Sequence, residues 1–184
     1  FDCGYENGFT PKILDILKKQ KATAAFFVTK PFIRENPDLV KRMKKEGHVV
    51  GNHTVHHKSM PSLSDRDNKQ EILDCAEYCK EATGYEMDQF IRPPMGEYSE
   101  ESLALTKKLG YKTIFWSMAY VDFKVDDQPG KEFVIKHFNE YAHNGAIPLL
   151  HNVSQSNAEA LEDVIKQLRK KGFEFLSLKK LPNY

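Results

Sequence analysis

One pattern of apolar and polar positions recurs four times along the chain. A segment with helical periodicity ends in paired basic residues, and a turn then leads into a short apolar run. The four copies are ILKKQKATAAFFV, RMKKEGHVVGN, TKKLGYKTIFW and LRKKGFEFLSL. Cations complement the dipole at a helix C-terminus, and three of the four turns carry the glycine expected after a helix end. The basic pairs are therefore interpreted as helix ends.

The apolar runs are too short for helices and rich in β-forming residues, which indicates buried strands. About seven are expected: 23–28, 48–52, 112–116, 173–178, the runs QFIRPP and GAIPLLH, and a strand ending at Phe1. Helices are expected over 10–20, 37–46, 64–83, 99–109, 131–143 and 157–171. Alternating strands and helices predict an α/β fold with a parallel sheet. Because no glycine-rich phosphate loop follows a strand, a distorted or incomplete (β/α) barrel is favoured over an open doubly wound sheet.

Composition narrows the class of protein. The 184 residues are 40% hydrophobic and 29% charged, as in an ordinary globular domain, and the net charge of +1 gives no basic footprint for nucleic acid. No apolar run approaches the roughly 20 residues of a membrane helix. The chain begins inside a motif, so we expect one domain over 1–184 that lacks its first strand and any upstream segment.

Ionisable residues stand where the expected strands end, although the strands themselves are apolar. These residues are Asp2, Cys3, His53, His57, Arg92, Asp122 and His151. A single histidine on an apolar strand is more often a core residue than a ligand. Catalytic groups of a (β/α) barrel come from the C-terminal ends of its strands, so the shared position indicates one functional site.

The segment HTVHH is a candidate metal-binding motif. His53 and His57 lie four residues apart, so a helical turn would direct both imidazoles at one divalent ion such as zinc. His53 with His56 is the alternative pair, and spacing alone does not decide between them.

The motifs FDCG, HTVHH, RPP, the segment around Asp122, and LLH occur in an order and spacing that resemble the five motifs of the polysaccharide deacetylase family. This family is also known as the NodB-homology family, or carbohydrate esterase family 4. The longer stretches FDCGYENGFTPKIL, EGHVVGNHTVHH, FWSMAYVDF and LLHNVSQSNAEAL resemble, more narrowly, the delta-lactam-biosynthetic de-N-acetylases of the PdaA type. The resemblance runs through nearly the whole chain.

The resemblance implies a role for each residue of the metal-binding half of the site. It assigns His53 and His57 to a divalent metal and Asp2 to the general base that deprotonates the attacking water. Arg92 would pair with Asp2 and keep it ionised and aimed. The backbone N–H of Met95 would stabilise the oxyanion.

It also implies the proton donor and the cleft. His151 would be the general acid that protonates the departing amine, with Asp122 raising its pKa. Residues expected to line the substrate cleft are Tyr5, Phe123 and Leu149. Other polar residues fit either substrate contacts or a loop and helix cap: Glu6, Asn7, Asn152, Ser154 and Asn157. For Ser154 to Asn157 the cap is favoured.

Two positions depart from the family pattern. Cys3 stands where most members carry a second aspartate, the third metal ligand. Either its thiolate is a ligand, which would favour zinc over magnesium or manganese, or the third ligand has been lost. Phe123 replaces the usual tryptophan, which keeps an apolar wall beside His151 but removes the indole N–H.

The resemblance implies metal-dependent removal of the N-acetyl group from muramic acid in peptidoglycan, linked to delta-lactam formation in spore cortex, with zinc as the expected cofactor. The alternatives are N-acetylglucosamine in peptidoglycan or chitin-like glycans, and a non-catalytic glycan-binding module. The expected partner is a glycan strand, with no nucleic acid and no membrane segment in the chain. The protein is expected to be an extracytoplasmic monomer, secreted or associated with the cell wall or spore cortex.

Overall fold

The chain folds into two compact units. The computed structural model describes residues 1–181 of the 184. The first unit, the sheet unit, comprises Asp2–Tyr5 and Ala25–Phe115, and the second, the helical unit, comprises Phe1, Glu6–Ala24 and residues 116–181.

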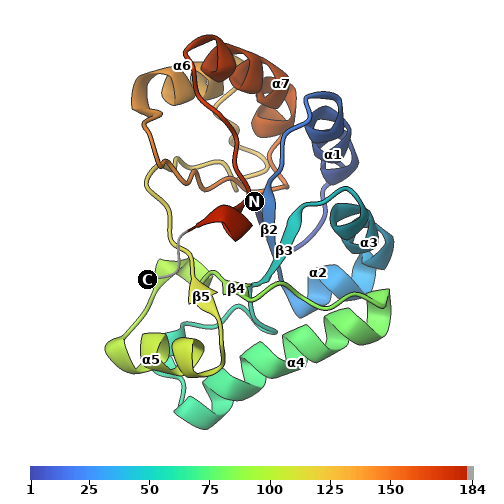
Figure 1. Ribbon diagram of the computed structural model, residues 1–184, viewed down its shortest axis with the longest axis vertical. Coiled ribbons are helices and arrows are strands. Elements are labelled where there is room, and N and C mark those ends of the chain that lie inside the picture. The colour runs from blue at the N-terminus through green and yellow to red at the C-terminus, as the bar shows by residue number, and fades with distance from the viewer. Residues whose placement is uncertain (182–184) are drawn as a thin grey trace. The chain divides into compact units, whose positions relative to one another are not determined.

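The sheet unit contains five parallel strands that pair in sequence order (Figure 1). They are β1 (Asp2–Cys3), β2 (Ala25–Val28), β3 (Val49–Asn52), β4 (Phe90–Ile91) and β5 (Lys112–Thr113). The longest run of paired residues is between β2 and β3, where Phe27 lies opposite Gly51. Since all five strands run in one direction, the residues that follow them meet at one edge of the sheet.

Helices pack around this sheet. They are α2 (Lys30–Glu35), α3 (Pro37–Lys45), α4 (Asp65–Thr83) and α5 (Glu100–Lys108), with short 3₁₀ helices η1 (Met60–Ser62) and η2 (Pro94–Gly96). The long α4 contacts α2, α3, α5 and β3. Ser64 caps its N-terminus by accepting a hydrogen bond from the Asp67 N–H, and Gly84 ends it in the left-handed conformation. This helix is thus fixed at both ends beside β3.

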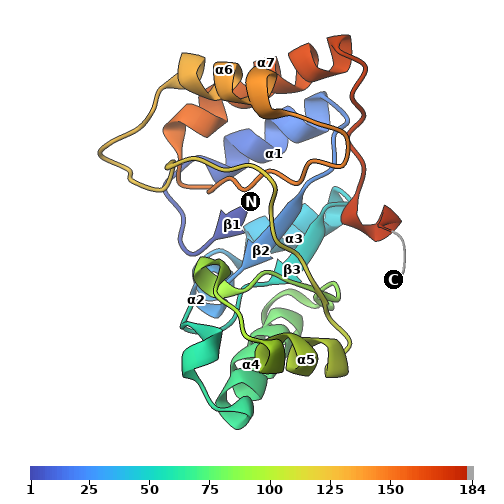
Figure 2. The same cartoon turned by 90° about the vertical axis from the view of Figure 1, so that its left-hand side faces the viewer.

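The helical unit is built from α1 (Thr10–Lys19), α6 (Lys131–Tyr141) and α7 (Gln155–Lys170), with 3₁₀ helix η3 (Leu178–Lys180). Figure 2 shows these three helices together, and α7 packs against both α1 and α6. Apolar side chains of α6 and α7 form the core with one residue that precedes α6 and one that lies between the two helices: Met118, Val134, Phe138, Leu150, Ala160, Val164 and Leu168.

The six expected helices are present with bounds within two residues of the expectation. Basic residues occupy the last turns of α1, α3, α5 and α7, as predicted. In the turn that lacks glycine, Lys21 itself adopts a left-handed φ of 48°. Helix α2 was not among the expected helices, although Thr29 caps it and Pro31 lies in its first turn. None of the helices in the described part of the chain is long and apolar enough to cross a membrane.

Two of the expected strands do not form, so these two predictions are wrong. The run 173–178 forms no strand; Phe173 and Phe175 pack their rings against the helical core instead. Within GAIPLLH no strand forms: Pro148 makes an isolated bridge with Met118, and His151 is a second isolated bridge residue. Alternating apolar residues can bury their side chains without a hydrogen-bonded ladder, and Pro148 has no N–H to donate to one.

Candidate active site

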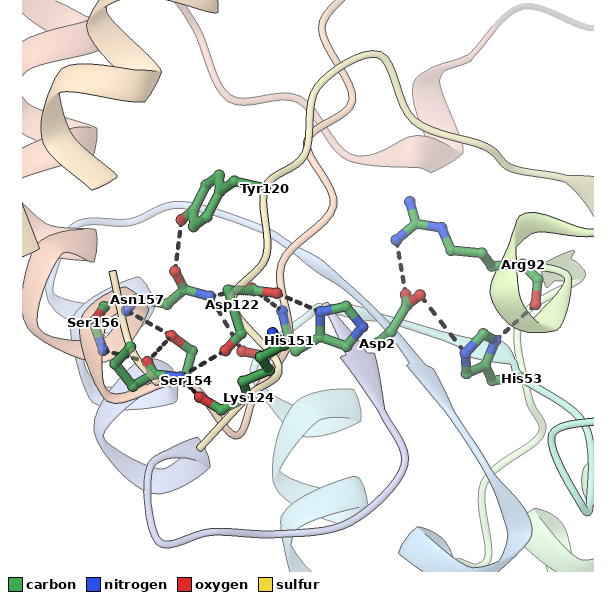
Figure 3. Close-up of polar contacts among 11 residues, drawn as sticks. Asp2, His53, Arg92, Tyr120, Asp122, Lys124, His151, Ser154, Ser156 and Asn157 are labelled. Atoms are coloured by element: carbon green, nitrogen blue, oxygen red, sulfur yellow. Dashed lines mark hydrogen bonds and ion pairs between the residues drawn. The ribbon is translucent and has the colours of Figure 1, made fainter. Parts of the chain in front are cut away.

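Asp2 and Arg92 form a buried ion pair at the C-terminal edge of the sheet (Figure 3). Arg92 follows β4, and its Nη1 lies 2.8 Å from Asp2 Oδ1. Nε and Nη2 of the same guanidinium donate to the carbonyls of Ile114 and Phe115, at 3.2 and 3.3 Å. Since Arg92 and Asp2 are only 2% and 6% exposed, each charge depends on the other for compensation.

A glycine in the neighbouring strand makes room for this pair. The guanidinium carbon of Arg92 lies 4.4 Å from the centroid of the Phe27 ring. A Cβ at Gly51 would lie 2.8 Å from that ring and 2.9 Å from the Phe90 carbonyl oxygen. The close approach at Gly51 therefore allows Phe27 to lie under the arginine.

His53 is held by the backbone of the same arginine. Its Nδ1–H donates to the Arg92 carbonyl at 2.7 Å, so the lone pair is on Nε2, which lies 3.6 Å from Asp2 Oδ2. Burial lowers the pKa of His53 to about 4, so the ring is neutral at pH 7, as a metal ligand must be. Burial would raise the pKa of Asp2, but His53 and Arg92 outweigh it and leave that pKa below its ordinary value.

The structure distinguishes the two possible histidine pairs. The rings of His53 and His57 lie edge to face with centroids 4.8 Å apart. The His56 ring turns elsewhere, and its Nδ1 lies 2.6 Å from Oε1 of Glu71 on α4. The geometry therefore supports His53 with His57.

These two imidazoles fit a divalent metal. A metal-bound histidine usually donates its other ring N–H to a backbone carbonyl or a carboxylate, and His53 donates its Nδ1–H to the Arg92 carbonyl in this way. Among residues 1–181, no three His, Cys, Asp or Glu side chains form a group arranged to hold an ion. Cys3 is buried and not disulfide-bonded, and its role as third ligand stays a prediction.

In the helical unit, Asp122 and His151 form a second cluster (Figure 3). The fully buried Asp122 carboxylate accepts three hydrogen bonds. Oδ1 accepts from His151 Nδ1 at 2.6 Å, and Oδ2 accepts from the His151 backbone N–H at 2.7 Å and from Asn157 Nδ2 at 2.6 Å. The predicted partnership of Asp122 with His151 is thus present, and it fixes the ring so that Nε2 can exchange a proton.

Two further residues belong to this cluster: Tyr120, which the sequence did not indicate, and Asn157, for which a helix cap and a substrate contact were both open. The Tyr120 hydroxyl donates to Asn157 Oδ1 at 2.6 Å, which orients the amide toward Asp122. Burial, with the charge of Asp122, raises the Tyr120 pKa well above its ordinary value, so the hydroxyl remains a donor. Asn157 also takes part in the cap of α7, because its N–H donates to Ser154 Oγ. Tyr120 gave no signal beyond lying two residues before Asp122.

The other predicted residues differ in exposure. Phe123 is half exposed and its ring meets His151 edge to face at 5.4 Å, which matches the expected apolar wall. Tyr5 is 49% exposed. Leu149 is 9% exposed and offers a ligand little surface. Met95 has a left-handed φ of 58° in the turn after β4. Their roles toward substrate stay predictions.

The polar residues that could contact either substrate or structure make structural contacts. Glu6 accepts hydrogen bonds from the N–H and hydroxyl of Thr10 at the start of α1. Asn152 donates to both Glu6 and Thr10, and Asn7 donates to the Val153 carbonyl. Ser154 caps α7. These contacts join the start of α1 to the segment that carries His151.

Comparison with known proteins agrees with this geometry. Residues 1–114 match the family model described as Polysaccharide deacetylase. The chain belongs to the polysaccharide deacetylase family. The expectation of a carbohydrate deacetylase is thereby confirmed, and members of this family are generally metal-dependent.

Two relatives and one solved structure define the position within the family. The chain is 47% identical over 178 residues to the peptidoglycan-N-acetylmuramic acid deacetylase PdaA of Bacillus subtilis, covering 97% of this chain and 68% of that protein. It is 33% identical over 187 residues to a peptidoglycan-N-acetylglucosamine deacetylase of Bacillus cereus, covering 100% and 86%.

The solved structure of Bacillus subtilis PdaA, a family 4 carbohydrate esterase, matches with a TM-score of 0.95 at 47% identity. The match covers 98% of this chain and 77% of that one. The expected fold class, the (β/α) barrel type of the polysaccharide deacetylases, and the PdaA-type resemblance are confirmed.

Proposed function

We propose that this member of the family removes the acetyl group from N-acetylmuramic acid residues of peptidoglycan, with Asp2 as general base. The observation that carries the proposal is the buried Asp2 held by Arg92 beside two imidazoles, His53 and His57. A carboxylate kept ionised next to two imidazoles that can hold a metal is the arrangement that hydrolytic attack on an amide needs.

The base acts on water. Asp2 has a lowered pKa and is therefore ionised at neutral pH, and Arg92 fixes one of its oxygens. Asp2 removes a proton from the water whose oxygen bonds to the acetyl carbon. The backbone N–H of Met95 stabilises the negative charge that develops on the carbonyl oxygen.

His53 and His57 would hold the metal, and zinc is proposed because imidazole and thiolate donors suit it. When bound, it polarises the water and the acetyl carbonyl. With Cys3 as a third ligand, Cys3→Ala should weaken zinc binding by orders of magnitude. An unchanged dissociation constant would leave the two histidines as the protein ligands.

His151 completes the reaction as general acid. Its Nδ1–H is occupied by Asp122, so Nε2 delivers the proton to the amine nitrogen as the C–N bond breaks. The products are acetate and a free amino group on the sugar. On muramic acid that amine can condense with the lactyl carboxyl, releasing water and closing a delta-lactam.

Muramic acid is proposed as the sugar because the relative matched at 47% identity is named for it. Tyr5, Phe123 and Leu149 are proposed to line the cleft. Because the proposed substrate is a glycan of the cell wall, we propose that the enzyme acts outside the cytoplasm and that it acts there as a monomer. N-Acetylglucosamine is the second candidate, since the Bacillus cereus relative is named for that substrate.

The test uses glycan strands of peptidoglycan whose muramic acid residues no longer carry peptides. The strands are incubated with zinc-loaded protein, with chelated protein and with the Asp2→Asn variant, and are analysed by mass spectrometry. We expect zinc-dependent loss of acetyl from muramic acid, and a further loss of water if the lactam closes. Acetyl loss from N-acetylglucosamine oligomers alone would select the second candidate. No mass change on either substrate would leave a glycan-binding module.

A further inference from the structure

The turn that carries His57 has a strained backbone. Thr54 and His57 both adopt left-handed conformations, with φ of 68° and 53°, although neither is glycine. Such conformations persist in non-glycine residues only where surrounding contacts over-determine them. The contacts that hold this turn therefore decide whether His57 lies beside His53.

The first contacts come from the end of β3 and from Thr54 itself. The Thr54 N–H donates to Asn52 Oδ1 at 2.9 Å, and the Thr54 hydroxyl accepts from the His57 N–H at 3.2 Å. They fix the two ends of the turn. The peptide groups between them, those of Val55 and His56, are bound by another element.

That element is α4, through the carboxylate of Glu71. Oε2 accepts hydrogen bonds from the N–H groups of Val55 and His56, at 3.0 and 2.7 Å, and Oε1 lies 2.6 Å from His56 Nδ1. Glu71 is only 9% exposed, whereas the His56 side chain is 63% exposed. A largely buried carboxylate thus binds three N–H groups of one turn.

The helix that carries Glu71 is itself tied to β3. Asn52 Nδ2 donates to the carbonyl of Ile72, the residue after Glu71, at 2.8 Å. Asn52 therefore connects the end of the strand both to the turn and to α4. This double connection gives Glu71 a fixed position from which to hold the turn.

We propose that Glu71 is a positioning residue for the metal site: with His56 it clamps the turn 54–57 in the strained conformation that places the His57 ring beside His53. The inference rests on the proposed role of His53 and His57 as metal ligands. It gives His56 a definite function, because its Nδ1 serves Glu71 and not the metal. Loss of a residue that orients a metal ligand typically weakens metal affinity by about 10–100-fold.

The first test measures zinc affinity by competition with a chromogenic chelator. We expect Glu71→Ala to weaken binding by about 10–100-fold. Glu71→Gln should recover most of this loss, because the amide oxygen can accept the two backbone N–H groups and the NH₂ can donate to His56. Glu77→Ala, an exposed position on the same helix, is the matched control and should bind zinc as the wild type does.

His56→Ala separates the clamp from direct ligation. It removes one of the three contacts to Glu71 and leaves both backbone hydrogen bonds, so the loss should stay below that of Glu71→Ala. If His56→Ala or Glu71→Ala weakened zinc affinity as much as His53→Ala does, the substituted residue would be a metal ligand. That result would overturn the proposal. Unchanged affinity in Glu71→Ala would also overturn it.

The second test needs no metal and no substrate. Hydrogen exchange, read residue by residue by NMR on the metal-free protein, reports the Val55 and His56 amides that donate to Glu71. In Glu71→Ala both should exchange at least about 10-fold faster, while amides in the centre of β2 and β3 keep their protection and so exclude general unfolding. Equal protection in wild type and variant would refute the clamp even if the proposed deacetylation were established, and loss of deacetylation alone would not affect it.

Discussion

The two clusters of candidate catalytic residues are held in different ways. In the sheet unit, Asp2 lies in β1 and Arg92 directly follows β4, and the guanidinium is fixed by backbone carbonyls and the Phe27 ring. In the helical unit, Asp122 lies in an irregular segment and is fixed by side chains and by the N-terminal region of α7. The first cluster depends on the sheet register, and the second depends on a network of hydrogen bonds.

This difference has a functional consequence. A buried ion pair is costly to break, because either charge left alone is uncompensated. A network of several hydrogen bonds loses about 1 kcal/mol with each bond and can weaken in steps. We therefore expect substitutions in the sheet unit to affect stability and metal binding, and substitutions in the helical unit to affect proton transfer.

Zinc binding should separate the clusters most clearly. We expect His53→Ala to weaken zinc affinity by more than about 100-fold, since loss of a ligand exceeds loss of a residue that orients one. His151→Ala should leave the affinity unchanged. Isothermal titration calorimetry on both variants measures this difference, and comparable losses in the two would remove the distinction between the clusters.

Asp122→Asn should lower activity without lowering metal affinity. An asparagine amide offers one acceptor oxygen in place of a carboxylate with two, so it cannot serve all three N–H donors around Asp122. The turnover number should fall by about 10²–10⁴-fold, the usual contribution of a positioned acid. Asp126→Asn, an exposed position in the same segment, is the control. Full activity in Asp122→Asn would show that the carboxylate does not support His151.

Arg92→Met should be the strongest destabilising change among these residues. It leaves Asp2 buried without its partner, which costs about 3–5 kcal/mol of unfolding free energy. Urea denaturation measures the loss. Arg34→Met removes an arginine whose side chain is 63% exposed and should change stability by less than about 0.5 kcal/mol. If Arg92→Met lost equally little unfolding free energy, burial of Asp2 without its partner would not be costly.

The sequence predicted the framework of both clusters well. Helical periodicity and basic helix ends located six helices, and the resemblance paired Asp2 with Arg92 and Asp122 with His151. These predictions succeeded because they rest on local patterns or on motifs that carry their own spacing. The strand expected over 173–178 was wrong because an apolar run records burial and not hydrogen bonding.

The residues that support the two clusters, which are Glu71, Tyr120 and Asn157, could not be found from local patterns or motifs. Glu71 lies in the middle of a long helix, where a glutamate ordinarily indicates an exposed face, and its contact with the turn of His57 depends on how α4 packs. Tyr120 and Asn157 are 37 residues apart. Taken alone, Tyr120 fits a core aromatic residue and Asn157 fits a residue of a helix cap. Contacts of this kind follow from tertiary packing, which a single sequence does not record.

Tyr120→Phe should give the smallest effect, and it tests whether the second cluster weakens in steps. The change removes one hydroxyl and one hydrogen bond to Asn157, while the ring keeps its contacts with Phe133 and His137. A loss of about 1 kcal/mol corresponds to roughly a fivefold fall in kcat/KM, with zinc affinity unchanged. Tyr141→Phe, at an exposed tyrosine of α6, is the matched control. If Tyr120→Phe instead lost as much activity as Asp122→Asn, the network would act as one cooperative unit, and its resistance to substitution would resemble that of the buried ion pair.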